Sequence, residues 1–158
     1  MQGVCEVPAP LPHDALPGAD WADAWQAEVK QSFTSAREAA EAIIENFPAW
    51  TGAMMALRQI LVAPFGLKGR PGSGDRIGIF PVVSESRQQL VAGFNDRHLD
   101  FRIVVDLEEQ AGKPEQAVTL TTVIKRHNLL GRIYLVAVMP FHRAIISTAL
   151  RRIREGRG

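Results

Sequence analysis

The sequence has almost no cysteine: Cys5 is the only one among 158 residues. One thiol cannot form a disulfide within the chain, and it cannot build a thiolate cage for a metal ion. We therefore expect a fold that depends on its apolar core, in a reducing compartment. We predict neither a metal site nor a cofactor.

Strong net charge is missing as well. The 18 Lys and Arg residues nearly balance the 17 Asp and Glu residues, which leaves a net charge of +1. Such a chain has no overall field that would attract nucleic acid or an anionic membrane. Its one basic cluster, in residues 151–157, suits the C-terminal end of a helix, where cations complement the helix dipole. We expect no nucleic-acid partner.

Membrane-spanning and targeting segments are not evident in the sequence. The longest unbroken apolar run, residues 133–141, is far shorter than the roughly 18 residues of a bilayer-spanning helix. The leader MQGVCEVPAPLPHDALPG has neither the basic region nor the apolar region of a signal peptide. We expect a cytoplasmic protein with no membrane span, and the sequence does not indicate its oligomeric state.

What is present is the composition of an ordinary folded protein, with 46% hydrophobic and 22% charged residues. A chain of this length forms one domain with a substantial core. Prolines recur between Pro8 and Pro17, and they fix the backbone and remove hydrogen-bond donors. We therefore predict a proline-rich, irregular N-terminal arm over residues 1–18 and a single domain over residues 19–158.

A strand and two short helices are predicted to follow the arm. Residues 21–29 place alternate side chains on one face if they are extended; a short helix capped by Asp20 is the alternative. Ser35 and Glu38 form a capping box in front of a helix that ends near Pro48. A second helix is expected over residues 50–60, followed by a glycine-rich loop over residues 67–75 that lacks the Gly-Lys-Ser/Thr ending of a phosphate-binding loop.

Alternation with a period of two begins at Ile77 and predicts an antiparallel run of strands over residues 77–83, 88–94, 98–107 and 116–125. The third segment is the clearest. Its apolar side chains fall on one face, and its polar side chains, among them His98, Asp100 and Arg102, fall on the other. The apolar face consists of Leu99, Phe101, Ile103, Val105 and Leu107.

A long C-terminal helix is predicted over residues 129–155, with Asn128 as its cap. Leu135, Met139, His142, Ile146, Ala149 and Ile153 form its apolar stripe. Pro140 cannot donate to the carbonyl of residue 136, so the helix should bend there. The predicted fold class is α+β, with a curved antiparallel sheet wrapped on this helix and two short helices after the first strand.

A bent helix over a curved sheet leaves space, and we expect a ligand cavity in it. Its predicted lining is Tyr134, Val138, Met139 and His142 from the helix and Leu99, Phe101, Ile103, Trp21 and Trp25 from the sheet. The polar groups would be the His142 imidazole and the Tyr134 hydroxyl. Two alternatives stay open: His142 is a core residue bonded to the carbonyl that Pro140 frees, and Met139 simply fills the core.

Asp23, Asp100 and His142 are the candidate catalytic residues. If Asp23 faces the core, its carboxylate needs a partner, and Arg58 and Arg102 are the candidates. His98 and Asp100 share a strand face and could orient a proton donor or hold a metal ion. The alternative is that His98 and Asp100 lie on a solvated outer face of the sheet, where Arg102 pairs with a carboxylate.

The stretches GADWADAW, IGIFPVVSES, GFNDRHLDFRIVV and TVIKRHNLLGRIYLVAVMPFHRAI together resemble an uncharacterised bacterial family, a domain of unknown function. Its members occur alone or fused behind NAD(P)-dependent epimerase-like and short-chain-dehydrogenase-like domains. The family is similar to the helix-grip superfamily of START, Bet v 1 and polyketide-cyclase-like proteins. This resemblance covers residues 16–154 and implies that an apolar small molecule is held between sheet and helix.

Three functions are therefore open. The first is a non-enzymatic module that binds an apolar or amphipathic small molecule. The second is an enzyme of the polyketide-cyclase-like type that uses His142 as acid or base, with Tyr134 or Asp23 assisting. The third, implied only by the fusions in the resembling family, is an accessory protein to a short-chain dehydrogenase.

Overall fold

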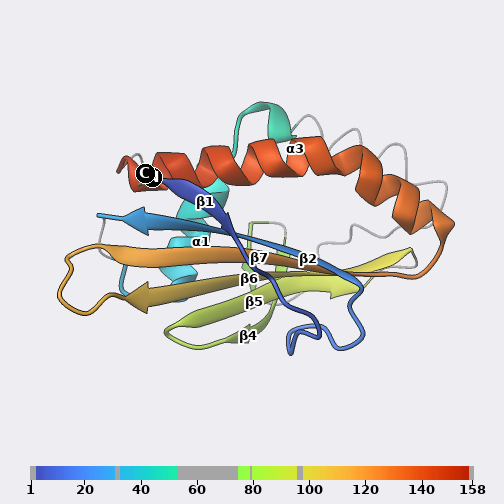
Figure 1. Cartoon of the computed structure of the whole chain (residues 1–158), viewed down its shortest axis with the longest axis horizontal. Helices are drawn as coiled ribbons and strands as arrows, with labels where there is room; N and C mark the ends of the chain where they lie inside the picture. Colours follow the sequence, from blue (N-terminus) through green and yellow to red (C-terminus); the bar gives the residue numbers. More distant parts are fainter. Residues whose placement is uncertain (1–2, 31–32, 53–74, 79, 96–97, 157–158) are drawn as a thin grey trace.

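The computed structural model describes residues 3–30, 33–52, 75–78, 80–95 and 98–156. Seven strands form one antiparallel sheet in the order β1-β2-β7-β6-β5-β4-β3, with helices α1 (Ala36–Glu45) and α3 (Leu129–Arg154) (Figure 1). The strands are β1 (Val4–Val7), β2 (Trp21–Val29), β3 (Arg76–Ile77), β4 (Phe80–Glu85), β5 (Gln89–Asn95), β6 (Leu99–Glu109) and β7 (Gln116–Arg126). This is the α+β, helix-grip-like arrangement predicted from the sequence.

The two long central pairings fix which residues share a face. Strand β7 pairs with β2 on one side and β6 on the other, so Asp23, Thr122 and Ile103 lie next to one another across three strands. The predicted alternation in β6 is confirmed, because its apolar residues join the core on the inner face. Residues 21–29 form a strand, and the helical alternative for them is wrong.

Strands β1 and β3 were not expected. Strand β1 lies inside the predicted irregular arm and pairs with β2 over Val4–Val7, which adds an edge to the sheet. The segment predicted as one strand over residues 77–83 is divided between β3, which has only the two residues Arg76–Ile77, and β4. Neither β1 nor β3 is long enough to show a period of two in the sequence, and the prolines that follow β1 mask its pairing.

The outer face of the sheet is only partly solvated. Leu16 from the arm is buried against Val91, Val104 and Val123, which point away from the helices. The backbone amide of residue 16 also bonds to the carbonyl of His13 at 3.2 Å. The arm therefore folds back over the sheet and protects a second, smaller apolar cluster.

Helix α1 begins with the predicted capping box. The Ser35 hydroxyl accepts a hydrogen bond from the Glu38 amide at 3.2 Å, and the Glu38 carboxylate accepts one from the Thr34 amide at 2.8 Å. That backbone hydrogen bond lowers the pKa of Glu38. The apolar side of α1 packs on β5, β6 and α3, so both helices cover the same face of the sheet.

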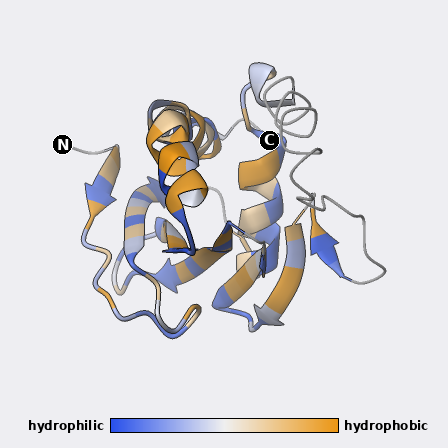
Figure 2. Ribbon diagram, turned by 90° about the vertical axis from the view of Figure 1, so that its right-hand side faces the viewer, coloured by the Kyte–Doolittle hydropathy of each residue, from blue (hydrophilic) through white to orange (hydrophobic). Residues whose placement is uncertain are grey.

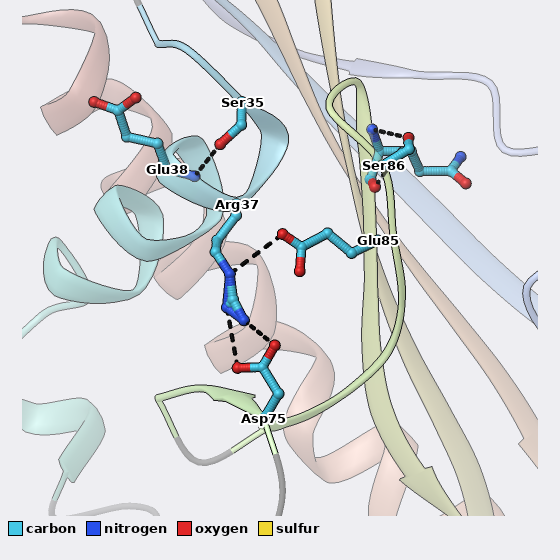
Figure 3. Close-up of polar contacts among 7 residues, drawn as sticks. Ser35, Arg37, Glu38, Asp75, Glu85 and Ser86 are labelled. Carbon is cyan, nitrogen blue, oxygen red and sulfur yellow. Dashed lines mark hydrogen bonds and ion pairs between the residues drawn. The ribbon is translucent and has the colours of Figure 1, made fainter.

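Figure 3 shows how Arg37 of α1 holds two carboxylates. Its guanidinium pairs with Asp75, just before β3, and its Nε lies 3.4 Å from Oε2 of Glu85 at the end of β4. The hydrogen bond from Arg37 lowers the pKa of Asp75 and raises that of Arg37. This pairing ties the β3–β4 edge to the start of α1.

Residues 50–52 are helical, as predicted, but residues 53–60 of the expected second helix lie outside the described residues. Most of the predicted glycine-rich loop, residues 67–74, lies outside them as well.

Helix α3 begins at the predicted cap, where the Asn128 side chain accepts a hydrogen bond from the Gly131 amide at 3.0 Å. Its first turn lies directly on the start of β6: a Cβ at Gly131 would come within 2.3 Å of the His98 carbonyl oxygen. The helix contains Pro140 and bends along its length (Figure 1). Its C-terminal half packs on β2 and α1, which leaves the N-terminal half to bridge the end of the sheet.

The N-terminal half of α3 is apolar on its outward side too. Leu129, Ile133, Val136 and Phe141 are exposed, and Figure 2 shows apolar colour around much of this part of the helix. By length and composition alone, α3 could cross a bilayer, but the core helix of a soluble protein meets the same criterion. Its contacts with β2, β7 and α1 are those of a soluble-type α+β domain.

Candidate functional site

A cavity of about 160 Å³ lies between the inner face of the sheet and α3, at the level of Pro140. Side chains from β2, β4, β5, β6 and β7 form its floor, α3 forms its roof, and residues 47 and 51 close one side. The lining is Trp21, Phe47, Thr51, Phe80, Phe94, Leu99, Phe101, Ile103, Thr122, Ile124, Tyr134, Leu135, Val138, His142, Ile145 and Ile146. The cavity separates the main core from the smaller cluster of Leu99, Ile124 and Leu135.

Aromatic rings dominate the floor. The ring centroids of Phe80 and Phe101 are 5.7 Å apart, and those of Phe94 and Phe101 are 5.6 Å apart, both in tilted arrangements. Rings in mutual contact keep one another in fixed orientations. The space beside them is therefore bounded by flat, apolar walls.

A hydrogen-bonded polar pair lies beside this apolar surface. Nε2 of His142, on α3, lies 3.1 Å from each carboxylate oxygen of Asp23, on β2. The Asp23 side chain is only 6% exposed and that of His142 16%. Trp25 adds a third group, because its Nε1 donates to Oδ2 of Asp23 at 3.2 Å. Two donors thus compensate a carboxylate that would otherwise be costly to bury.

The hydrogen bond to Asp23 fixes the role of each imidazole nitrogen. A carboxylate accepts, so Nε2 carries the proton, and in the neutral ring Nδ1 is then the base. Nδ1 makes no hydrogen bond with any residue in the described part of the chain. The indole of Trp21 holds the ring edge-on, with centroids 6.1 Å apart and an interplanar angle of 75°. His142 therefore has a fixed ring orientation in the cavity wall.

Two buried hydroxyls in the lining lack partners. Oγ1 of Thr122 and Oγ1 of Thr51 are inaccessible to water, and neither forms a hydrogen bond with the residues that the structure describes. Thr122 is 1% exposed and lies next to Asp23 across the β2–β7 pairing. Buried hydroxyls are nearly always paired, so each of these is a candidate contact for a ligand.

Most of the predicted lining residues are brought together around this cavity. Tyr134, Val138 and His142 reach it from α3, and Leu99, Phe101, Ile103 and Trp21 reach it from the sheet. Met139 instead packs against the cluster of Leu99, Ile124 and Leu135. Trp25 is not in the lining but binds Asp23 from the side.

The predicted partners of Asp23 need correction. The partner is His142, and Arg102 is excluded because it projects from the outer face of β6. Nη1 of Arg102 instead donates to the Phe101 carbonyl at 2.8 Å, and its guanidinium pairs with no carboxylate among the described residues. Arg58 lies outside the described residues. His142 is bonded to the Asp23 carboxylate and not to a backbone carbonyl, which was the alternative considered for it.

His98 and Asp100 lie at the junction of β6 and α3, away from the cavity. Nδ1 of His98 lies 2.9 Å from the Asn128 amide nitrogen, and Oδ1 of Asp100 lies 2.9 Å from Nε2 of His127. These contacts hold the entry of α3 on the sheet. No group of three possible metal ligands occurs in the described ranges.

Sequence reasoning missed Thr122 and Thr51. Thr122 alternates correctly with Leu120 and Ile124 on the inner face, but a threonine in a strand is ordinary and gives no sign of an unpaired hydroxyl. Only the position of Thr122 opposite Asp23 distinguishes it, and that position is known only once the register of β2 and β7 is known.

A family model described as "Protein of unknown function (DUF2867)" matches residues 15–149. The chain belongs to this family. The match includes every residue in the cavity lining. No curated protein and no solved structure matches the chain. Within the DUF2867 family, function therefore has to be argued from the site itself.

Proposed function

We propose that this DUF2867 protein binds an apolar or amphipathic small molecule in the cavity between the sheet and α3. The observation that carries the proposal is the cavity itself, with aromatic walls and a single polar region around His142 and Asp23. Small-molecule sites have this composition, mostly apolar with a few polar groups that orient the ligand.

Filling the cavity tests the proposal. Val138→Trp adds an indole to the roof of the cavity, whereas Val136→Trp adds the same group to α3 at a side chain that is 72% exposed. We expect ligands that raise the melting temperature of the wild type to do so for Val136→Trp but not for Val138→Trp. No thermal shift of the wild type with any of a broad panel of apolar and amphipathic compounds contradicts the proposal.

A second candidate function is catalysis of proton transfer in the same cavity. It is favoured by the His142–Asp23 pair, since a carboxylate that orients an imidazole is the usual support of a general base. Nδ1 of His142 would accept a proton from the bound molecule. In an assay with a substrate, His142→Ala should abolish turnover and leave binding measurable, whereas a pure binding module has no turnover to lose.

We also propose a cytoplasmic location, because the exposed, unpaired Cys5 suits a reducing compartment. A dehydrogenase partner stays a prediction from the resemblance, and copurification with the native protein tests it.

A further inference from the structure

The cavity's size and polar region narrow the chemistry of its ligand. This inference rests on the proposed binding function and deepens it. We infer that the ligand is a single-ring molecule with a neutral hydroxyl, a phenol in its simplest form, whose hydroxyl meets Nδ1 of His142 and Oγ1 of Thr122.

The volume of the cavity limits the size of the ligand. A protein cavity of about 150 Å³ accommodates benzene, and the cavity here has about 160 Å³. One six-membered ring with one or two substituent atoms therefore fills it. A fused polyketide or a long acyl chain exceeds this volume and would extend beyond the lining residues.

The walls select a flat ring. Phe80, Phe94 and Phe101 on the sheet present adjoining rings, and Trp21 stands at the polar end beside His142. Aromatic side chains pack well against a further ring in offset or edge-on arrangements.

The polar end selects a hydroxyl. When the His142 ring is neutral and protonated at Nε2, a ligand hydroxyl can donate to its Nδ1 and accept from the Thr122 hydroxyl. Neither of these two groups has a partner among the described residues. The Thr51 hydroxyl is a further unpartnered group in the lining. A purely apolar ligand such as toluene would leave all of these groups unsatisfied.

The same end disfavours a carboxylate. Asp23 is buried next to Thr122, and both its oxygens are engaged by His142 and Trp25. A ligand carboxylate would place a second negative charge beside it in a region of low dielectric, which raises the cost of binding. Neutral hydroxyl compounds are thus favoured over acids of the same size.

The experiment compares phenol, toluene and benzoate by calorimetry at pH 7 with the wild type and with two threonine variants. Thr122→Val removes the buried, unpartnered hydroxyl of a residue in the cavity lining and keeps the shape of the side chain. Thr121→Val is the matched control, because it makes the same change one residue along β7, on the opposite face of the sheet.

For the wild type we expect phenol to bind at least about fivefold more tightly than toluene, the value of one net hydrogen bond, and benzoate to bind most weakly. Thr122→Val should lose most of the phenol advantage while toluene affinity is unchanged or improved. Thr121→Val should keep the wild-type order. A melting temperature of Thr122→Val that equals or exceeds that of the wild type shows that the variant is folded.

Phenol binding no better than toluene, benzoate binding best, or an undiminished phenol advantage in Thr122→Val overturns the inference. The proposed binding function stands in each of those outcomes as long as one of the three compounds, or a member of the broad panel, binds. If none of the three compounds binds and the broad panel also fails, the binding function and the inference fall together.

Discussion

Nε2 of His142 sits equidistant from both carboxylate oxygens of Asp23, at 3.1 Å, and so joins the roof of the cavity to its floor. The contact links the middle of α3 to an inner position of β2. The two side chains are more deeply buried than those of any other ion pair among the described residues, so the pair should contribute to stability.

A double-mutant cycle measures that coupling. His142→Ala leaves a buried carboxylate with Trp25 as its only donor, and we expect a loss of about 2–3 kcal/mol in the free energy of unfolding. The coupling energy from Asp23→Ala, His142→Ala and the double variant should be about 1–3 kcal/mol, determined by urea unfolding. The His127–Asp100 pair is a matched control: it is closer, at 2.9 Å, but its side chains are 30% and 15% exposed. Its coupling should stay below about 1 kcal/mol, and equal coupling in the two pairs would contradict the assignment.

Gly131 is predicted to be intolerant of any side chain. A Cβ there would lie 2.3 Å from the backbone oxygen of His98, so Gly131→Ala must lift the first turn of α3 from β6. We expect a loss of about 2 kcal/mol or more in urea unfolding, although alanine favours helix by about 1 kcal/mol. Gly52→Ala is the control, since a Cβ at Gly52 meets nothing within 4 Å and the change should be neutral or stabilising. A harmless Gly131→Ala would show that α3 is not seated as described.

The arm is predicted to contribute to stability through Leu16. Leu16→Ala uncovers Val91, Val104 and Val123 on the outer face and should cost about 2–3 kcal/mol. Leu11→Ala removes the same atoms from a side chain on the arm that is 39% exposed and should cost little. Chemical denaturation measures the free energy of unfolding of the two variants. Similar losses in Leu16→Ala and Leu11→Ala would mean that the arm is not docked on the sheet.

Acid should weaken the Arg37–Asp75 pair. Because Arg37 lowers the pKa of Asp75, the folded state favours the ionised carboxyl. The contribution is therefore complete above the ordinary aspartate pKa of about 3.9 and is lost as the pH falls through the lowered value. Arg37→Gln should lower the melting temperature at pH 7, and the gap from the wild type should close toward pH 2. Arg132→Gln removes a charge from the exposed side of α3 and should leave the curve unchanged; a constant gap for Arg37→Gln would contradict the pairing.

The sequence predicted the fold well where a long periodic pattern existed. The alternation in residues 98–107 defined the inner face of β6, and Asn128 marked the start of α3. It did not predict β1 or β3, since two to four residues carry no usable period.

The site was predictable only in part, because periodicity shows which face a side chain occupies but not which residue it meets. Helical and strand periodicity placed His142 and Leu99 on facing surfaces, but no local pattern pairs Asp23 with His142, because that contact depends on the β2–β7 register and on where α3 crosses it. Arg102 was proposed for Asp23 although the alternation of β6 already set it on the other face. That error was avoidable from the sequence alone.

The pair that joins the sheet to the final helix comes from opposite ends of the chain: Asp23 and His142 are 119 positions apart. During synthesis, β2 leaves the ribosome long before β7 and α3 exist, so Trp21 and Trp25 have no complete core to pack against until the final helix docks. A chain that ended before α3 would leave the apolar inner face of the sheet exposed to chaperones and proteases. The cavity is therefore completed only when α3 docks, at the last stage of folding.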